Sequence, residues 1–413
     1  MSDLNPTKTS RNVVLLVLVA SLGYFVDIYD LLVFSIVRKA SLLGIGVKPA
    51  DVQDKGIFII NMQMLGLLLG GILWGVIGDK LGRIKVLFGS ILLYSLANFA
   101  NGFVGDVNTY AIVRFIAGIG LAGELGAGIT LVTETMSKEK RGYGTMIVSA
   151  IGLFGAALAV VVAKYGWQKA YFVGGGLGIV LLLLRLGTFE SGMFKNVERN
   201  DEVSKGNFFM LFTNGKRFLK YLYCILIGAP LWYVVGVLVT LSPEFGGPKA
   251  LHATEPLNAG VGILYTYIGI AVGGLIAGIF SQITKSRKLT MLIFLLLSVV
   301  SVVVYLRSVG LDNAKFVWLC FFMGCTVGYW TIFITIAAEQ FGTNIRSTVA
   351  TTVPNFVRGS LIPINFAFAA MAKSYGMINA GYIMMGILTV VAVFALSQLK
   401  ETFHKDLDYI EVS

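Results

Sequence analysis

The segment Gly75-Val-Ile-Gly-Asp-Lys-Leu-Gly-Arg83 is a short charged turn between two long apolar runs. Each run is close to the roughly 20 apolar residues that a helix needs to cross a bilayer. The same alternation of apolar runs and short polar segments continues in both directions from this turn. We expect twelve membrane-spanning helices, at residues 12–37, 57–78, 84–104, 108–133, 142–163, 168–187, 218–242, 258–281, 289–308, 313–336, 347–370 and 376–398.

The composition of the whole chain agrees with a polytopic membrane protein. Of the 413 residues, 56% are hydrophobic and 13% are charged, whereas an average soluble chain carries about a quarter of charged residues. This scarcity of charge excludes a soluble enzyme and a disordered protein. The net charge is +11, but the basic residues lie in short clusters between apolar runs. We therefore expect the lipid bilayer as a partner, and no nucleic acid.

The distribution of basic residues predicts how the chain is oriented. When both termini are placed on one side, most of the loop lysines and arginines fall on that side. Basic residues favour the cytoplasm, so we expect both termini there. The longest polar interruption, residues 188–217, separates six spans from six. We expect an N-terminal half (1–187), a cytoplasmic linker (188–217), a C-terminal half (218–398) and a cytoplasmic tail (399–413).

The two halves align when the chain is offset by about 205 residues. The turn after the second span then matches residues 278–285, which follow the eighth span. Two acid–base pairs, each seven residues apart, lie at corresponding turns after the fourth and tenth spans: Glu134 and Arg141, and Glu339 and Arg346. This internal repeat predicts two halves related by a pseudo-two-fold axis.

Three motifs resemble those of a known family. Gly75-x-x-x-Asp79-Lys80-x-Gly82-Arg83 resembles the loop signature of the major facilitator superfamily, and Arg114-x-x-x-Gly118-x-Gly120-x-x-Gly123-Glu124 resembles the fourth-helix signature of its proton-coupled members. The segment Gly23–Asp30 is similar to the first helix of metabolite:proton and phosphate:proton symporters. The resemblance implies an all-α fold with a central cavity that opens alternately to each side. It implies gating by Asp79, Arg83, Glu134, Arg141, Glu339 and Arg346.

Five charged residues stand out because they lie well inside predicted spans rather than near the span ends: Asp27, Asp30, Arg114, Glu124 and Arg358. A charge at mid-membrane costs about 2.5–3.5 kcal/mol on insertion scales, so we expect each of these residues to have a functional role or a partner of opposite charge. Three acids face two bases, and protonating one acid would balance them. We expect Asp27, Asp30 or Glu124 to carry a proton; a static ion-pair network is the alternative. Arg114 and Arg358 are candidate anchors for the substrate, although Arg358 could equally form an ion pair that locks a lid.

Aromatic and amide side chains are candidates for the rest of the cavity. Aromatic rings with polar tips suit organic solutes, although packing and interfacial belts are equally good explanations. The amides could instead form hydrogen bonds between helices. We expect the remaining substrate contacts from Tyr24, Trp232, Tyr233, Tyr329, Trp330, Asn61, Gln63 and Asn355.

These features together predict a secondary active transporter of the bacterial inner membrane. We expect a monomer that imports a small organic solute, anionic or zwitterionic, together with protons. An exporter of amphipathic or cationic compounds is the alternative, favoured by the excess of carboxylates. A receptor or a membrane enzyme is a third reading, which no catalytic motif supports. No nucleotide-binding loop and no metal-ligand spacing occurs in the sequence, so we expect no enzymatic activity, no cofactor and no metal.

Overall fold

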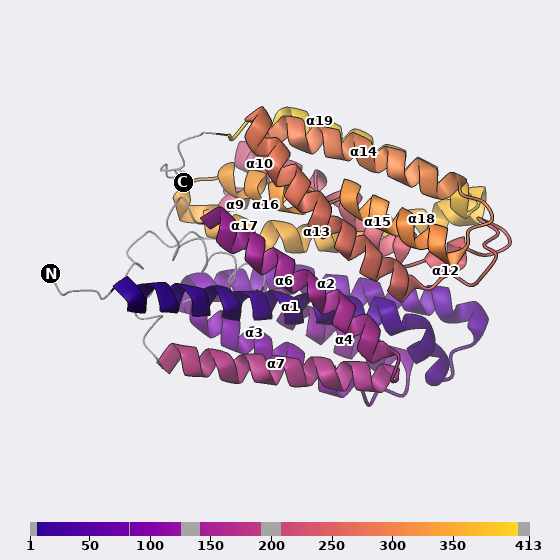
Figure 1. Ribbon diagram of the computed structural model, residues 1–413, viewed down its shortest axis with the longest axis horizontal. Coiled ribbons are helices and arrows are strands. Elements are labelled where there is room, and N and C mark those ends of the chain that lie inside the picture. The colour runs from indigo at the N-terminus through magenta and orange to yellow at the C-terminus, as the bar shows by residue number, and fades with distance from the viewer. Residues whose placement is uncertain (1–5, 82, 125–140, 191–207, 404–413) are drawn as a thin grey trace.

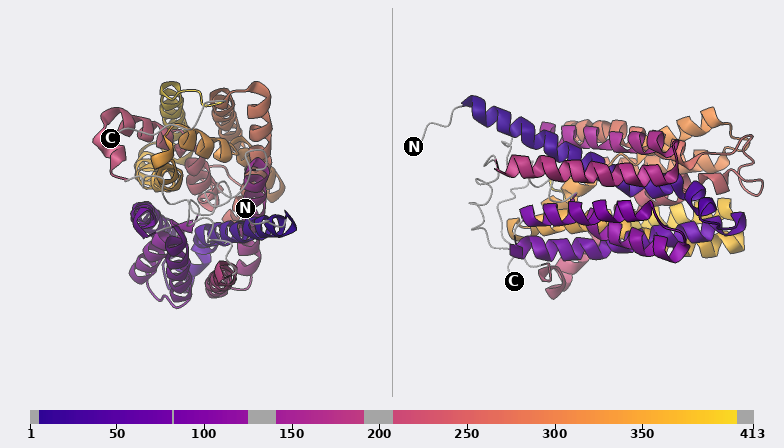
Figure 2. Two further views of the ribbon diagram at one scale, coloured as in Figure 1. Left: turned by 90° about the vertical axis from the view of Figure 1, so that its left-hand side faces the viewer. Right: turned by 90° about the horizontal axis from the view of Figure 1, so that it is seen from below.

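The structure is a computed structural model, in which residues 6–81, 83–124, 141–190 and 208–403 are described. All regular elements within these ranges are helices. They run along one long axis and form two bundles side by side (Figures 1 and 2). Seven of the described helices are long and apolar enough to cross a bilayer. The prediction of an all-α polytopic membrane protein is confirmed.

The N-terminal bundle contains the first six predicted spans. Its helices are α1 (Pro6–Gly44), α2 (Val52–Leu81), α3 (Arg83–Asn101), α4 (Val107–Leu121), α6 (Arg141–Ala163) and α7 (Trp167–Glu190), with a short 3-10 turn, η1 (Pro49–Asp51), before α2. Helix α1 begins at the end of the bundle that we call the terminal end, where α19 also ends (Figure 1). The opposite end, which carries α12, is called the loop end.

The C-terminal bundle contains the other six spans, and three of them are broken. Its elements are α9 (Met210–Thr213), α10 (Gly215–Leu226), α11 (Ala229–Tyr233), the π-helix η2 (Val234–Val239), α12 (Ser242–Phe245), α13 (Ala259–Thr284), α14 (Arg287–Arg307), α15 (Asn313–Thr326), α16 (Trp330–Glu339), α17 (Thr343–Gly359), α18 (Leu361–Tyr375) and α19 (Met377–Gln398).

The expected uninterrupted spans 218–242, 313–336 and 347–370 are each divided. The seventh is split between α10 and α11, where Pro230 lacks an N–H, and continues as η2. The tenth is interrupted at Val327–Tyr329 between α15 and α16, and the eleventh at Ser360 between α17 and α18. Hydropathy measures only whether a run is apolar, so it does not detect these breaks. They fall beside the site described below.

Matching glycine contacts relate the two bundles. Gly118 of α4 lies directly against the backbone of α2 at Gln63, and Gly324 of α15 lies against the backbone of α13 at Thr266. Neither position has room for a Cβ atom, so both helix pairs depend on glycine for this close approach. The two contacts are separated by about 205 residues in the chain. The internal repeat in the sequence is therefore accompanied by the same close helix–helix contact in each half.

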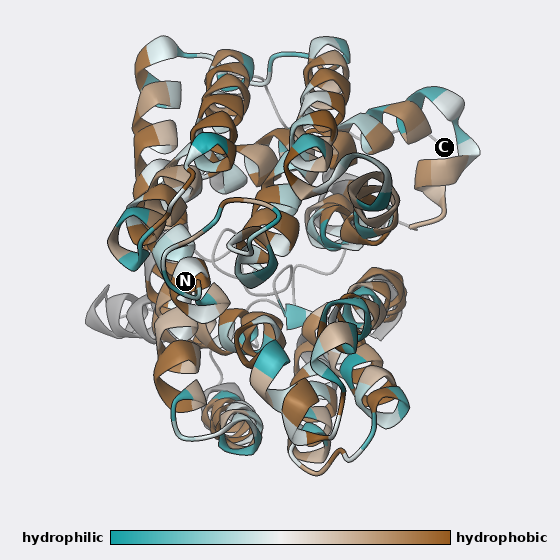
Figure 3. Cartoon of the chain, turned by 90° about the vertical axis from the view of Figure 1, so that its right-hand side faces the viewer, coloured by the Kyte–Doolittle hydropathy of each residue, from teal (hydrophilic) through white to brown (hydrophobic). Residues whose placement is uncertain are grey.

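The outer faces of the bundles are apolar. Leu96, Ile283, Phe366 and Val390 are all more than half exposed. An end-on view coloured by hydropathy shows mostly apolar helices, with polar residues concentrated in the connecting loops and at helix ends (Figure 3). Side chains of this kind are suited to contact with lipid. The charged residues inside the bundles therefore stand out as exceptions.

Candidate functional site

A buried ion pair joins the two halves near the middle of the molecule. Nη2 of Arg358, on α17, lies 3.5 Å from Oδ2 of Asp27, on α1. Neither side chain is more than 1% exposed. Nη1 of Arg358 also donates to Oδ1 of Asn355 at 3.4 Å. The sequence left open whether Arg358 anchors a substrate or forms a lock, and in this structure it spans the interface between the halves.

Aromatic side chains surround this ion pair. The guanidinium of Arg358 lies 5.8 Å from the ring centroid of Trp232, whose ring is 6.5 Å from that of Trp330. Tyr24 of α1 lies within electrostatic reach of Arg358 and Asp27 and beside Trp330. Three of the predicted aromatic contacts are therefore brought together around one guanidinium.

Two further aromatic candidates are placed differently. The hydroxyl of Tyr233 donates to the carbonyl of Gly381 in α19 at 2.8 Å, so this ring packs within the C-terminal bundle. Tyr329 is fully buried at the break between α15 and α16. Tyr267 of α13 was not predicted, yet it lies within electrostatic reach of Tyr24, Arg358 and Asp27. Its neighbours come from distant helices, so nothing in the local sequence indicates its place.

Asp30 and Arg114 form a second buried group, inside the N-terminal bundle. Nη2 of Arg114 donates to the backbone carbonyl of Asp30 at 3.0 Å, and Nη1 donates to Oδ1 of Asn98 at 3.4 Å. The guanidinium also lies 5.6 Å from the ring centroid of Tyr171. Asn98 lies beside the Asp30 carboxylate, but neither oxygen of that carboxylate has a hydrogen-bond partner among the described residues. Arg114 thus finds its partners on other helices.

Glu124 is held by a residue that the sequence did not single out. Arg185 of α7 binds both carboxylate oxygens of Glu124, with Nη1 donating to Oε2 at 3.0 Å and Nη2 contacting Oε1. Both side chains are buried and pack against Gly23 of α1. They lie so close to Gly23 that this position has no room for a Cβ atom. Arg185 sits at the end of the predicted span 168–187, where it resembles a loop charge.

This finding corrects the charge balance. With Arg185 included, three buried acids face three buried bases in this region: Asp27, Asp30 and Glu124 against Arg114, Arg185 and Arg358. Charge balance alone therefore no longer requires that one acid be protonated. The geometry of each acid decides its role instead.

The predicted amide contacts connect helices. Nδ2 of Asn365 donates to Oδ1 of Asn61 at 2.7 Å, which joins α18 to α2 across the two halves. Nε2 of Gln63 donates to the carbonyl of Leu31 at 3.2 Å. Nδ2 of Asn355 donates to the carbonyl of Ala122 at 3.0 Å, again across the halves. These contacts correspond to the interhelical alternative.

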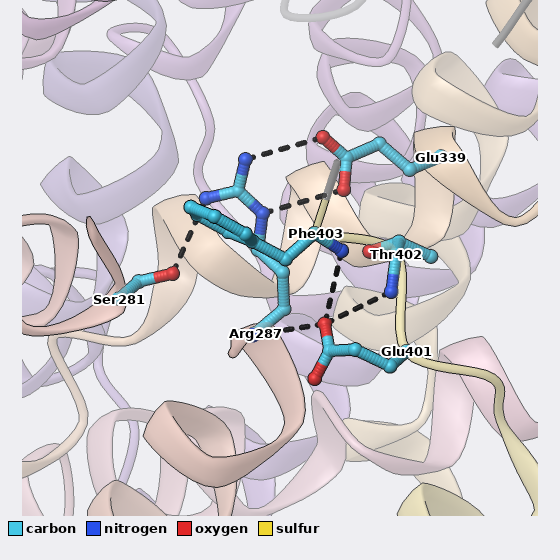
Figure 4. A network of polar contacts seen from close by, with 6 residues as sticks. All are labelled: Ser281, Arg287, Glu339, Glu401, Thr402 and Phe403. Atoms are coloured by element: carbon cyan, nitrogen blue, oxygen red, sulfur yellow. Dashed lines mark hydrogen bonds and ion pairs between the residues drawn. The ribbon is translucent and has the colours of Figure 1, made fainter. Parts of the chain in front are cut away.

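One predicted gating residue is seen in a network at the terminal end. Glu339 pairs with Arg287, at the start of α14, with Nη2–Oε1 and Nε–Oε2 distances of 3.2 and 3.3 Å (Figure 4). Nη1 of Arg287 donates to Oγ of Ser281, and the ring of Phe403 stacks on the guanidinium. The side chains of Asp79, Arg83, Arg141 and Arg346, and the whole of Glu134, lie outside the described residues.

Glu401 ties the segment after α19 to the same network. Its carboxylate accepts hydrogen bonds from Oγ of Ser286 and from the backbone N–H groups of Arg287 and Lys288. Figure 4 shows Glu401 with Arg287 and with its neighbours Thr402 and Phe403. Partial burial acts to raise the pKa of Glu401, but these hydrogen bonds and one from the Phe403 N–H outweigh it and bring the pKa to about 2. The carboxylate therefore caps α14 as an anion at neutral pH.

The described residues contain no group of three or more His, Cys, Asp or Glu side chains arranged to hold a metal ion. The chemistry of the central region is instead that of paired charges and aromatic rings. Such a region can exchange an ion pair for a charged ligand, and its carboxylates can bind and release a proton.

The comparisons with known proteins agree with this architecture. A Bacillus subtilis protein named for niacin/nicotinamide transport is 25% identical over 94% of this chain and 96% of its own length. The gentisate transporter of Corynebacterium glutamicum is 24% identical over 90% of this chain and 84% of its own. The solved structure of the proton:xylose symporter XylE superposes with a TM-score of 0.68 at 16% identity, covering 97% of this chain and 98% of that one.

The family model described as Major Facilitator Superfamily matches residues 20–360. This range includes the central ion pair, the Asp30–Arg114 group and both turns of the internal repeat. The match spans most of both halves, and the relatives are similar over nearly the whole chain. The chain belongs to the Major Facilitator Superfamily and is a multi-pass membrane transporter of small molecules.

Proposed function

We propose that this transporter imports a small organic anion or zwitterion together with protons, by alternating access between its two halves. The observation that carries the proposal is the Asp27–Arg358 ion pair, buried between the halves and bordered by Trp232 and Trp330. A buried arginine that already binds one carboxylate is suited to bind another. A solute carboxylate would take the place of Asp27 on the guanidinium.

The substrate class follows from the same group. The flat ring of Trp232 lies next to the guanidinium, and the ring of Trp330 lies next to that of Trp232, so a planar solute with one carboxylate fits this combination best. One relative is named for niacin/nicotinamide and the other for gentisate. Niacin and gentisate are aromatic carboxylates, whereas nicotinamide is the neutral amide of niacin. This similarity supports the same chemical class for the present chain and makes these two compounds the first to test.

The three buried acids differ in how firmly they are held. Both oxygens of Glu124 are bound by Arg185, so this carboxylate already has a bidentate partner. One oxygen of Asp27 pairs with Arg358, and its other oxygen has no partner among the described residues. Neither oxygen of Asp30 accepts a hydrogen bond from the residues that the structure describes. We assign proton binding to Asp30 and, once a solute has taken Arg358, to Asp27; Glu124 is assigned a structural role.

The orientation and the moving parts belong to the same proposal. The terminal end would face the cytoplasm of a bacterial cell, because the basic loops gather there. Residues 1–187 and 218–398 would move as two units of a monomer in the inner membrane, connected by the linker 188–217 and followed by the tail 399–413. Gating would involve Asp79, Arg83, Glu134, Arg141, Glu339 and Arg346.

Export of cationic compounds is the alternative function, and the central ion pair argues against it. A cation would need Asp27 as its partner, but Arg358 occupies that carboxylate and would repel the cation. The aromatic rings would suit either class of solute.

Uptake of radiolabelled niacin and gentisate into proteoliposomes tests the proposal. We expect accumulation with an outside-acid pH gradient, loss of accumulation with a protonophore, and no uptake by Arg358→Gln. The matched control is Arg307→Gln, an exposed arginine at the end of α14. Wild-type uptake by Arg358→Gln, or uptake of cations in preference to carboxylates, would overturn the proposal.

A further inference from the structure

Arg38 crosses between the two halves at the loop end, far from the central ion pair. It lies on α1, near the end of that helix, and its guanidinium reaches into the C-terminal bundle. Nη2 of Arg38 lies 2.8 and 2.9 Å from the two carboxylate oxygens of Glu244 on α12, and 3.2 Å from the carbonyl oxygen of Thr240. Arg38 is 2% exposed and the Glu244 side chain is 18% exposed.

The partners of Arg38 lie at the end of an irregular helix. Thr240 follows the π-helix Val234–Val239, and both its N–H and its hydroxyl bond to the carbonyl of Val235. The seventh span is therefore built of short pieces rather than one rigid helix. A π-helical turn of this kind often marks a functional site. Arg38 donates to the carbonyl of Thr240, the residue directly after the π-helix, where the helix dipole is negative.

The hydrogen bonding of Arg38 is incomplete among the described residues. Nη2 makes all three contacts, whereas Nε and Nη1 are buried and have no hydrogen-bond partner among the described residues. The stem packs on Gly56 of α2, where a Cβ atom would lie 2.6 Å from Cδ of Arg38. Separation of the halves at this end would let water reach the two free donors, which offsets part of the lost ion pair. Such a contact can both form and release.

We propose that Arg38 and Glu244 form a latch that holds the loop end closed and opens in each transport cycle. The inference rests on the alternating-access function proposed above, and adds a contact that the central site does not contain. Ile36 and Gly260 meet across the same interface, since a Cβ on Gly260 would lie 3.0 Å from Cγ2 of Ile36. The side chain at position 36 is only partly exposed here, and its exposure should increase when the latch opens.

A cysteine at position 36 reports the state of the latch. Ile36→Cys is introduced into the full chain after Cys224, Cys320 and Cys325 have been replaced by alanine. The rate of maleimide labelling is measured in nanodiscs without any solute. Arg38→Gln and Glu244→Gln should each raise this rate about tenfold, which corresponds to about 1.4 kcal/mol in the opening equilibrium. The double variant should label no faster than the faster single variant, because both changes remove the same contact.

The control is Lys39→Gln, an exposed neighbour on α1 that loses the same charge. It should leave the labelling rate unchanged. Elution as a single peak in size-exclusion chromatography shows that each variant is folded. Unchanged labelling in both latch variants, or an equal increase with Lys39→Gln, would overturn the proposal. Because labelling needs no substrate, failure of niacin and gentisate uptake with an intact labelling pattern would overturn only the proposed function.

Discussion

Removing either partner of the Asp27–Arg358 ion pair should destabilise the protein, and removing both should cost little more. The Nη2–Oδ2 distance of 3.5 Å gives a Coulomb attraction of about 5 kcal/mol at an effective dielectric constant of 20. Desolvation of the two charges offsets much of this attraction. A lone buried charge left behind costs about 3–5 kcal/mol, so Asp27→Asn and Arg358→Gln should each lower the free energy of unfolding by that order.

A double-mutant cycle measures this coupling, with unfolding by SDS in mixed micelles followed by circular dichroism. The coupling energy between Asp27→Asn and Arg358→Gln should be about 2–4 kcal/mol, the part of each single loss that is due to an unpaired charge. The control cycle uses Asp312 and Lys315, whose charged atoms are closer, at 3.1 Å, but whose side chains are 41% and 71% exposed. That pair should show no resolvable coupling. Additive losses at the central pair would refute the assignment of a buried ion pair.

Four further predictions follow from individual contacts. Gly23→Ala should destabilise by about 1–3 kcal/mol through overpacking against Glu124 and Arg185, measured by thermal unfolding; Gly176→Ala on α7, where a Cβ meets nothing within 4 Å, is the control, and an equal loss there would contradict the reasoning. Arg185→Gln should reduce uptake as much as Glu124→Gln, and wild-type uptake by either variant would contradict a shared role. Asn365→Ala should destabilise by about 1–3 kcal/mol because Asn61 is left buried without its donor, and the double variant with Asn61→Ala should lose less than the two single losses added. Glu401 has a pKa of about 2 against an ordinary 4.5, so its stabilising effect is present above pH 4.5 and is lost as the pH falls toward 2; the melting temperatures of wild type and Glu401→Gln should therefore differ at pH 6 and converge on acidification.

The fold could be predicted from the sequence because it depends on the average hydropathy of long segments and on the internal repeat, not on single contacts. Apolar runs such as 57–78 and 84–104 must cross the bilayer as helices, since lipid offers no hydrogen bonds to the backbone. The repeat offset and the turn Gly75–Arg83 then indicate the family. The breaks near Gly228, Gly328 and Ser360 depend on how neighbouring helices pack. Hydropathy carries no information about that packing.

The candidate site was predictable in its residue types but not in its pairs. Asp27, Asp30, Arg114, Glu124 and Arg358 are charges within apolar runs, and all five are buried. Their partners come from other helices, so the chain alone does not reveal that Glu124 binds Arg185 or that Asp27 binds Arg358. Arg185 and Arg38 were missed because each lies at the end of an apolar run. A signal was present, since Ala40, Leu42 and Leu43 continue the apolar run after Arg38.

Proton coupling through Asp30 is the central claim, and one variant tests it most directly. In proteoliposomes, Asp30→Asn should still exchange labelled for unlabelled niacin or gentisate, because solute binding at Arg358 does not need this carboxylate. The same variant should fail to accumulate either compound when the outside is made acidic. Accumulation by Asp30→Asn to the wild-type level under the pH gradient would contradict the account.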